Sequence, residues 1–189
     1  MLKDIVYKTR SYRRFDQSYS ISQEVLKDLV DLARCSASLK NLQPLKFYLS
    51  NKPETNELIF PNLSWAGYLA DWPGPVEGER PSAYIIVLGD TNLSEKINCD
   101  HGIAAQSIML GATEKGLGGC MLSSVRRKAV HESLGILESY KILLVLALGK
   151  SIETVVIEQV GSDGDTRYYR DKDQVHHVPK RSLDELIIG

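Results

Sequence analysis

Two uninterrupted apolar stretches constrain the fold of this chain more than any other feature. They are "SAYIIVLGD" (residues 82–90) and "KILLVLALGK" (residues 141–150). A strand that exposes one face to water alternates apolar and polar residues, whereas a strand with both faces covered is apolar throughout. The first stretch therefore predicts a strand covered on both faces, and the second predicts the most hydrophobic strand of the chain.

Other elements alternate irregularly with these strands, so we expect a mixed α+β layer structure and not a doubly wound sheet. The next apolar face, built from Ile21, Val25, Leu29 and Leu32, has helical spacing. Its helix can start at Ser20, which forms a capping box with Gln23, or at Ser22. Helices are expected at residues 2–9, from Ser20 or Ser22 to about Cys35, from about Ser94 to Lys115 with Gly116 as its cap, and at 125–135; strands are expected at Leu45–Ser50 and 153–160.

The long helix and the C-terminal tail both point to contacts beyond a simple core. Gly102, Ala105 and Gly111 put small residues on several faces of the helix, which favours the centre of a domain or a subunit interface. The tail, about 165–189, is too polar for a core of its own but carries periodic apolar residues, so we expect it to dock onto another surface. The chain of 189 residues has the length of one domain, 1–189.

Composition excludes several classes of protein. The net charge of −1 argues against general nucleic-acid binding. No apolar run approaches the roughly 20 residues of a membrane helix, and the N-terminus does not resemble a signal peptide. Three widely spaced cysteines suit a reduced, cytoplasmic protein, and we expect Cys35, Cys99 and Cys120 to be small buried hydrophobic residues.

Several catalytic and metal-binding motifs are missing from the sequence. There is no G-x-S-x-G elbow, P-loop or H-E-x-x-H. "GLGGC" lacks the G-x-G-x-x-G spacing and follows a helix, so it is not a dinucleotide fingerprint. Cys99 and His101 have no second pair of ligands, and the neighbours His176 and His177 would face opposite sides of an extended segment, so we predict no metal site.

Basic residues gather at both ends of the chain. Arg10, Ser11 and Arg13 offer two guanidinium groups and a hydroxyl within four residues, and Lys180 and Arg181 follow Pro179. Guanidinium groups suit bidentate contact with phosphate or carboxylate oxygens, so one anionic ligand held from both termini is one interpretation. The alternative is that both clusters are solvated surface.

Two further stretches have the composition of ligand-binding loops. "SASLKNLQPL" (36–45) offers Ser38, Asn41 and Gln43, whose donors and acceptors can match the uracil-like edge of a heterocycle. In "GLGGCMLSS" (116–124) the glycines allow a close approach of the main chain to a ligand. Each stretch can also be a plain turn.

Four motifs in this order resemble the nitroreductase family of FMN-dependent oxidoreductases, over nearly the whole chain. "TRSYRRF" (9–15) is similar to the family's R-S-x-R-x-F, and "SASLKNLQPLKF" (36–47) to its P-S-x-x-N-x-Q-P-W. "DHGIAAQSIMLGATEKGLGG" (100–119) resembles its central helix and glycine loop, and "VPKRSLDEL" (178–186) its closing basic segment. Ala37 and Leu45 depart from the proline and aromatic residue common in the family, and residues 52–82 are shorter than the substrate-covering insertions of larger members.

The resemblance implies a three-layer fold with a mainly antiparallel central sheet and an intertwined homodimer. Its two FMN sites would lie at the interface, with the C-terminal segment docked on the partner. The resemblance implies that Arg10 and Ser11 hold the phosphate and ribityl chain, joined by Lys180 and Arg181, and that Arg13 lies at the pyrimidine edge. It implies that Ser38, Asn41 and Gln43 approach from the partner subunit. It places Leu122 and Ser123 beside the ring, with a backbone N–H of this stretch facing flavin N5.

The implied activity is ping-pong hydride transfer from NADH or NADPH through flavin N5 to a nitroaromatic, quinone or similar small aromatic acceptor. Arg13 would supply the cation near N1/O2, and no residue is assigned as a catalytic acid or base. Trp65, Tyr68 and Trp72 are candidates to stack on the acceptor, although ordinary core packing explains them as well. "RRK" (126–128) can meet a 2′-phosphate or begin a solvated helix. A different flavin reaction (dehalogenation or ene reduction) and a flavin-storage protein without turnover remain alternatives.

Overall fold

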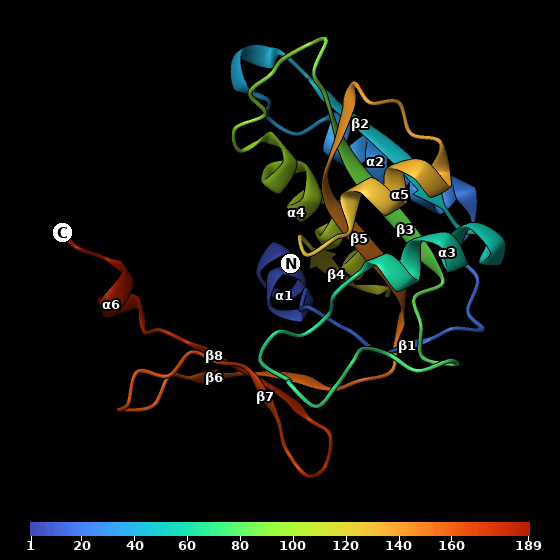
Figure 1. The fold of residues 1–189 in the computed structure, drawn as a ribbon. Coiled ribbons are helices and arrows are strands. Elements are labelled where there is room, and N and C mark those ends of the chain that lie inside the picture. The colour runs from blue at the N-terminus through green and yellow to red at the C-terminus, as the bar shows by residue number, and fades with distance from the viewer.

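The computed structural model describes all residues, 1–189, and is built around a five-stranded antiparallel sheet (Figure 1). Its strand β5 (Tyr140–Ser151) pairs with β3 (Ala83–Asp90) on one side, and β3 pairs with β2 (Leu45–Ser50). On its other side β5 pairs with β4 (Gly118–Leu122) and with the two-residue β1 (Phe15–Asp16). The two apolar stretches are thus adjacent central strands, as the sequence predicts.

Helices cover both faces of this sheet. All eight residues of β3 are buried, and their alternation divides them between two cores. Ile85 and Val87 join the core under α2 (Gln23–Arg34) and α4 (Asp100–Glu114), whereas Ile86 and Leu88 join the core under α3 (Pro53–Ile59) and α5 (Arg127–Leu134). The predicted α+β fold of three layers is therefore confirmed. Short 3₁₀ turns, η1 (Leu39–Asn41) and η2 (Phe60–Asn62), complete the layers.

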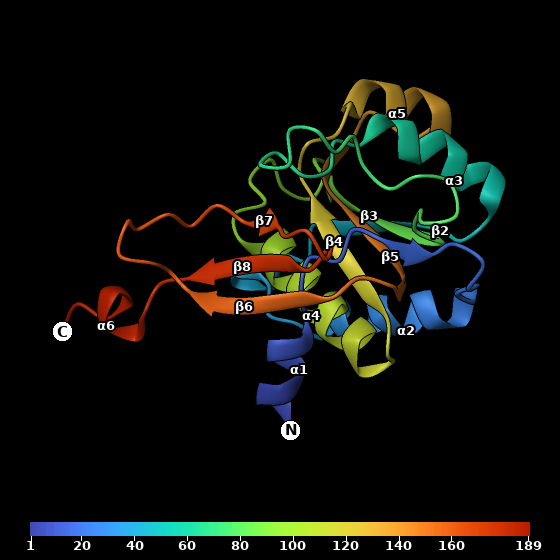
Figure 2. The ribbon, with the colours of Figure 1, turned by 90° about the horizontal axis from the view of Figure 1, so that it is seen from below.

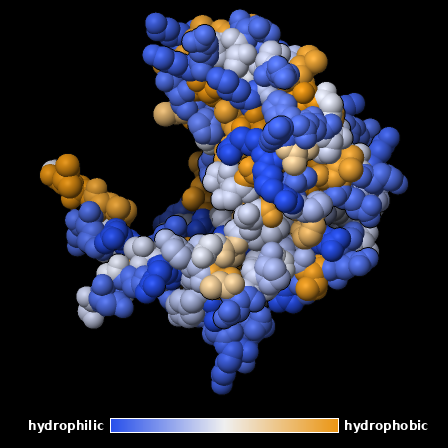
Figure 3. All heavy atoms as spheres, in the orientation of Figure 1, coloured by the Kyte–Doolittle hydropathy of each residue, from blue (hydrophilic) through white to orange (hydrophobic).

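The C-terminal region forms an arm beside this body rather than part of either core. Strand β6 (Val155–Gln159) runs parallel to β8 (His176–Lys180), and β7 (Tyr169–Arg170) pairs with the other edge of β8. The arm ends in the short helix α6 (Leu183–Leu186), which points away from the body in both ribbon views (Figures 1 and 2). In Figure 3 a hollow separates the arm from the body, and apolar residues gather at the tip of the arm. The arm thus has no core of its own.

The helix ends decide between two predicted starts of α2 and correct the predicted start of α4. Ser22, not Ser20, caps α2, because its Oγ accepts the N–H of Val25 at 3.3 Å. Helix α4 begins at Asp100 and not near Ser94, since Asn98 has a φ of +50°, which does not fit a right-handed α-helix. The predicted end at Gly135 is confirmed by its left-handed φ of +61°.

The cysteines differ from the expectation of three buried residues. Cys120 is buried in strand β4, whereas Cys35 and Cys99 are exposed at the ends of helices. No cysteine is in a disulfide. None of the helices has the length and apolar character that crossing a membrane requires.

Candidate functional site

The first helix and β4 fix the position of the N-terminal basic segment. Helix α1 (Leu2–Lys8) ends at Thr9, whose Oγ1 donates to the carbonyl of Ile5 at 2.8 Å and contacts Thr113 Oγ1 of α4 at 2.9 Å. The next residues lie along β4, and the N–H of Tyr12 donates to the carbonyl of Gly119 at 2.9 Å. A Cβ on the neighbouring Gly118 would lie 2.8 Å from the ring of Tyr12. The glycines after α4 therefore let this segment pack against the sheet.

Beside this segment is a cavity of about 350 Å³ between the body and the arm. Its wall includes Arg10, Ser11 and Arg13 from the N-terminal segment and Lys180 from β8. Three cationic side chains thus meet around one space, and no carboxylate lies in the wall. An arrangement of this kind attracts an anion such as a phosphate. The structure brings together four of the residues that the sequence predicts for one anionic ligand.

Arg10 is held in place but retains free donors. Its Nη2 donates to the carbonyl of Val6, in the last turn of α1, at 2.8 Å. Its Nε is buried and has no hydrogen-bond partner. Since a buried N–H without a partner is unfavourable, this group favours a ligand that accepts a hydrogen bond.

Arg13 is the most buried cation of the cavity, with 7% of its surface exposed. Its Nη1 donates to the carbonyl of Ser11 at 3.1 Å and contacts His176 Nε2 at 3.2 Å. The guanidinium carbon lies 4.7 Å from the centre of the Tyr168 ring, which is a cation–π distance. The guanidinium forms no ion pair, so its charge is available to a ligand.

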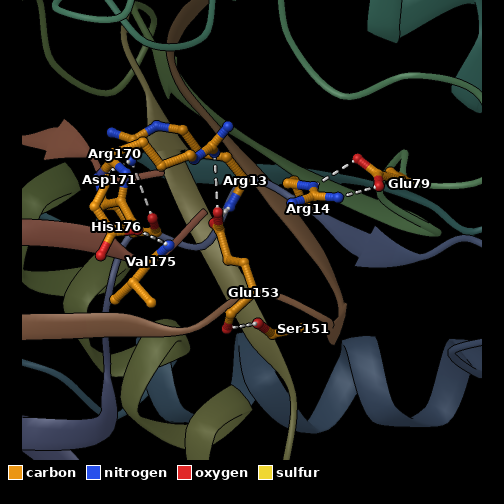
Figure 4. Close-up of polar contacts among 10 residues, drawn as sticks. Arg13, Arg14, Glu79, Ser151, Glu153, Arg170, Asp171, Val175 and His176 are labelled. Atoms are coloured by element: carbon orange, nitrogen blue, oxygen red, sulfur yellow. Dashed lines mark hydrogen bonds and ion pairs between the residues drawn. The ribbon is translucent and has the colours of Figure 1, made fainter. Parts of the chain in front are cut away.

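A buried ion pair joins Glu153, which follows β5 of the body, to Arg170 in β7 of the arm (Figure 4). The Glu153 carboxylate accepts the backbone N–H of Arg13 and pairs with Arg170 at 3.0 Å. The Glu153 and Arg170 side chains are only 1% and 8% exposed. Arg170 also lies 4.4 Å from the centre of the Trp72 ring. Glu153 thus holds the first residues of the site and the start of the arm together.

His176, at the start of β8, is neutral in this setting. Burial, together with the nearby charges of Arg13 and Arg170, lowers the pKa of His176 to about 4. Because arginine only donates, the Nε2 of His176 accepts from Arg13, and the ring proton is on Nδ1. That Nδ1 is buried and has no partner.

The neighbouring His177 faces the opposite side of β8, as the sequence predicts. Its Nδ1 lies 2.9 Å from Glu158 and its Nε2 lies 3.1 Å from Asp171. These carboxylates raise the pKa of His177 above its ordinary value. The surroundings therefore favour the neutral form of His176 and the protonated form of His177.

A second cavity, of about 320 Å³, contains the predicted polar loop. Ser38 and Gln43 line it together with Asp100 at the start of α4. The Ser38 hydroxyl donates to Asp100 Oδ2 at 2.6 Å and accepts the backbone N–H of Gln43 at 2.9 Å. Lys40, Asn41 and Gln43 all have left-handed φ angles, of +51°, +56° and +50°. Such backbone is unfavourable for residues other than glycine, and it clusters at functional sites.

Helix α4 connects the two cavities. Asp100 and Ala104, in its first turns, line the second cavity, and Gln106 and Met109 line the first. Within one chain Ser38, Asn41 and Gln43 do not reach the cavity of Arg10 and Arg13. That these residues serve the site of another subunit stays a prediction.

Leu122 and Ser123, the predicted flavin neighbours in the glycine loop, line neither cavity. Strand alternation puts the side chain of Leu122 in the core of the α3 and α5 face, so only its backbone can reach a ligand. Met121, one residue earlier, lines the first cavity instead. Ser123 is exposed, and its carbonyl accepts from Arg127 at 3.0 Å.

Two further arginines of the basic segments pair with carboxylates and are not part of the cavity wall. Arg181 does not line the cavity, since it points to solvent and pairs with Glu185 at 3.1 Å. Arg14, next to Arg13 in the sequence, is not free in solvent. Its Nε donates to Glu79 at 2.7 Å, and the pair is partly buried. Glu79 is 65 residues away in sequence, so no local pattern predicts this contact.

The three candidate acceptor-stacking residues have three different environments. Trp65 is buried in a core, and a Cβ at Gly74 would lie 2.6 Å from its ring, so it serves packing. Trp72 packs against the same core and supports Arg170. Tyr68 is 60% exposed, and its ring centre lies 4.9 Å from that of Tyr168 in the cavity wall. Of the three, only Tyr68 is exposed beside a residue of the cavity wall.

Sequence reasoning missed the arm's share of the site. Tyr168 and His176 line the cavity, and Glu153 and Arg170 hold it together. The available signal was weak: a polar tail that lacks a core of its own must satisfy its charged residues elsewhere. Within the described chain, no group of three or more histidine, cysteine or acidic side chains is arranged to hold a metal ion.

The fold and this cavity define an α+β protein with a cationic site between its body and a C-terminal arm. A family model described as the nitroreductase family matches residues 6–71 and 79–150, which include the first basic segment, both central strands and α4. The chain belongs to the nitroreductase family.

Comparison with known proteins agrees with this assignment. YodC of Bacillus subtilis, which has the provisional name of an NAD(P)H nitroreductase, is 24% identical over 180 residues, covering 79% of this chain and 89% of YodC. The solved structure of a provisionally named nitroreductase from Exiguobacterium sibiricum in complex with FMN has a TM-score of 0.68 at 20% identity and covers 81% of this chain and 89% of its own. A nitroreductase family protein from Clostridium difficile has a TM-score of 0.68 at 17% identity and covers 100% and 96%.

One solved structure with another activity has the same fold. CLA-ER is described as an enone reductase that catalyses a key step of fatty acid saturation in gut bacteria. It is 18% identical, with a TM-score of 0.68, and covers 80% of this chain and 89% of its own. At this identity the likeness concerns the fold alone.

Proposed function

We propose that this protein is an FMN-dependent oxidoreductase that transfers electrons from NADH or NADPH to a nitroaromatic, quinone or similar acceptor. The observation that carries the proposal is the cavity in which Arg10, Arg13 and Lys180 meet without a carboxylate. Membership of the nitroreductase family supports it, as do the name of YodC and the FMN complex of the Exiguobacterium protein.

The residues of the cavity fit a flavin mononucleotide. Arg10 and Lys180 would bind its phosphate, and the unpartnered buried Nε of Arg10 supplies a donor for it. The Ser11 hydroxyl would bind the ribityl chain. Bound FMN would supply the hydride chemistry that no side chain of this protein provides.

Arg13 would act on the bound cofactor through its charge. Its guanidinium is 7% exposed and lacks an ion pair, so water and protein screen it weakly. A fixed cation of this kind stabilises negative charge that develops during the reaction. We assign no side chain as a catalytic acid or base, because a proton can come from water or from the acceptor.

We further propose that two copies of the chain form each site. Helix α1 buries none of its residues in its own chain. The exposed large apolar residues on α1, on α4 and on α6 with the residues after it are Leu2, Val6, Tyr7, Ile103, Leu183, Leu186, Ile187 and Ile188. Apolar residues exposed on separate elements favour a protein–protein interface. A second copy in the hollow of Figure 3 would cover them and bring Ser38, Asn41 and Gln43 of the partner subunit to the flavin.

A flavin titration tests the proposal. FMN fluorescence should be quenched as the protein is added, and the titration should give a stoichiometry of one FMN per chain. Anaerobic NADH or NADPH should then bleach the visible flavin absorbance, and a nitroaromatic or a quinone should restore it. A protein that does not bind FMN contradicts the proposal, and bound FMN that neither NADH nor NADPH bleaches favours the storage alternative.

The acceptor is tested in the same assay. Because the enone reductase CLA-ER has the same fold, an enone belongs among the acceptors alongside a nitroaromatic and a quinone. Recovery of absorbance with the enone alone would favour ene reduction.

Sedimentation with and without residues 181–189 tests the dimer, since loss of α6 should weaken it. A monomer that binds FMN with full affinity would contradict the shared site.

A further inference from the structure

The charge of Arg13 in the cavity is held by the arm. The N-terminal segment gives its guanidinium one contact, from Nη1 to the carbonyl of Ser11 at 3.1 Å. The other two contacts come from residues more than 150 positions later, His176 Nε2 at 3.2 Å and the Tyr168 ring at 4.7 Å. Without the arm, the long arginine side chain would have several rotamers and would point into solvent as readily as into the cavity.

The two arm residues support each other. The Tyr168 ring centre lies 5.2 Å from that of His176, so both rings form one wall. The Tyr168 hydroxyl accepts the backbone N–H of Tyr68 at 3.4 Å. The backbone N–H of His176 donates to the carbonyl of Thr154 at 2.9 Å, which fixes the start of β8. This wall has a defined position and can therefore define the position of Arg13.

No carboxylate competes with this arrangement. The buried acid Glu153 uses one oxygen for the backbone N–H of Arg13 and the other for Arg170. The guanidinium of Arg13 thus has a neutral acceptor and an aromatic face as partners, and neither cancels its charge. Partners of this kind fix a cation while leaving its charge available to a ligand.

We propose that His176 and Tyr168 are positioning residues that hold the Arg13 guanidinium in the cavity and thereby set the reduction potential of the bound flavin. This inference rests on the proposed function. It assigns the control of the flavin's electronics to the arm, through a hydrogen bond and a ring. Since a reduced flavin carries more negative charge than an oxidised one, a fixed cation raises the potential, and a mobile one raises it less.

The first test uses the protein without added flavin. Nitrogen-15 NMR of the histidine rings should find His176 with its proton on Nδ1 and with an Nε2 shift that moves in Arg13→Leu. The control is His177, whose shifts should stay the same in Arg13→Leu. A His176 with its proton on Nε2 at neutral pH would overturn the inference whether or not FMN binds.

The second test is the midpoint potential of bound FMN. His176→Leu removes the acceptor, and we expect the preference for reduced over oxidised FMN to fall about ten-fold, equal to about 30 mV for a two-electron couple. His176→Gln should restore most of it, because an amide oxygen can accept in place of Nε2. Tyr168→Phe keeps the aromatic face and should match the wild type, whereas Tyr168→Leu should lower the potential.

His177→Leu is the matched control, since it damages the other face of the same strand without touching Arg13. Equal potentials in His177→Leu and His176→Leu, or no change in His176→Leu, would overturn the inference. If His176→Leu does not retain FMN, the FMN affinity of His176→Gln decides instead. A recovered affinity supports the inference, and a folded His176→Gln protein without that recovery opposes it. A wild type that binds no FMN would instead remove the proposed function.

Discussion

Removal of the charge on Glu153 should be among the most destabilising single changes in this protein. The carboxylate is 1% exposed and has two partners, the backbone N–H of Arg13 and the guanidinium of Arg170 at 3.0 Å. In Glu153→Gln one oxygen can still accept from Arg13, but Arg170, itself 8% exposed, loses its counter-charge. Breaking a buried pair on one side costs about 3–5 kcal/mol. For a chain of this size that corresponds to a fall in Tm of roughly 6–20 °C.

Thermal and urea unfolding of the variants measures this cost. Asp165→Asn is the control, because it breaks an exposed pair, Asp165–Arg167 at 2.7 Å, and should leave Tm unchanged. The double variant Glu153→Gln/Arg170→Met should be more stable than Glu153→Gln alone, since it leaves no unpaired buried charge. A Tm for Glu153→Gln equal to that of Asp165→Asn would refute the reasoning and would mean that water reaches the pair.

Three other predictions follow from the same contacts. Arg10→Ala should weaken FMN binding by about 1.5–3 kcal/mol, which is the scale of a hydrogen bond to a charged group. Lys128→Ala, on the exposed side of α5, is the control and should leave the FMN affinity unchanged. Equal losses of affinity in both variants would mean a nonspecific charge effect. Stability should fall as pH drops from 6.5 toward 4, because His176 is neutral when folded with a pKa of about 4 and binds its proton more readily when unfolded; a flat unfolding curve over this range would contradict it. The raised pKa of His177 acts in the opposite sense: its contribution is full below pH 6.5 and is lost as pH rises through the folded value, so His177→Leu should remove that alkaline loss, measured by denaturant titration at several pH values.

The central strands could be predicted from the sequence because their apolar runs depend on burial alone. Both faces of β3 are covered, and its residues alternate between the two cores as an uninterrupted apolar strand requires. The start of α4 could not be predicted in the same way. Residues 94–99 are compatible with a helix, and the positive φ of Asn98 depends on how the preceding turn packs.

The site was predicted where its residues are close in sequence and missed where they are distant. Arg10, Ser11 and Arg13 form a local cluster that a motif reveals. The contact of Arg13 with His176 spans 163 positions, and a pairing of that range leaves no periodic signal. Met121, and not Leu122, has its side chain in the cavity wall, and this was missed for a different reason. The alternation of a strand shows that neighbouring side chains lie on opposite faces, but it does not show which face meets the cavity.

The central claim, that the cationic cavity binds FMN, is tested most directly by a crystal structure of the protein crystallised with FMN. We predict one flavin per chain, with phosphate oxygens within hydrogen-bond distance of Arg10 and Lys180 and with the ring beside Met121 and Arg13. A flavin bound elsewhere, or a phosphate that touches neither Arg10 nor Lys180, would contradict the account.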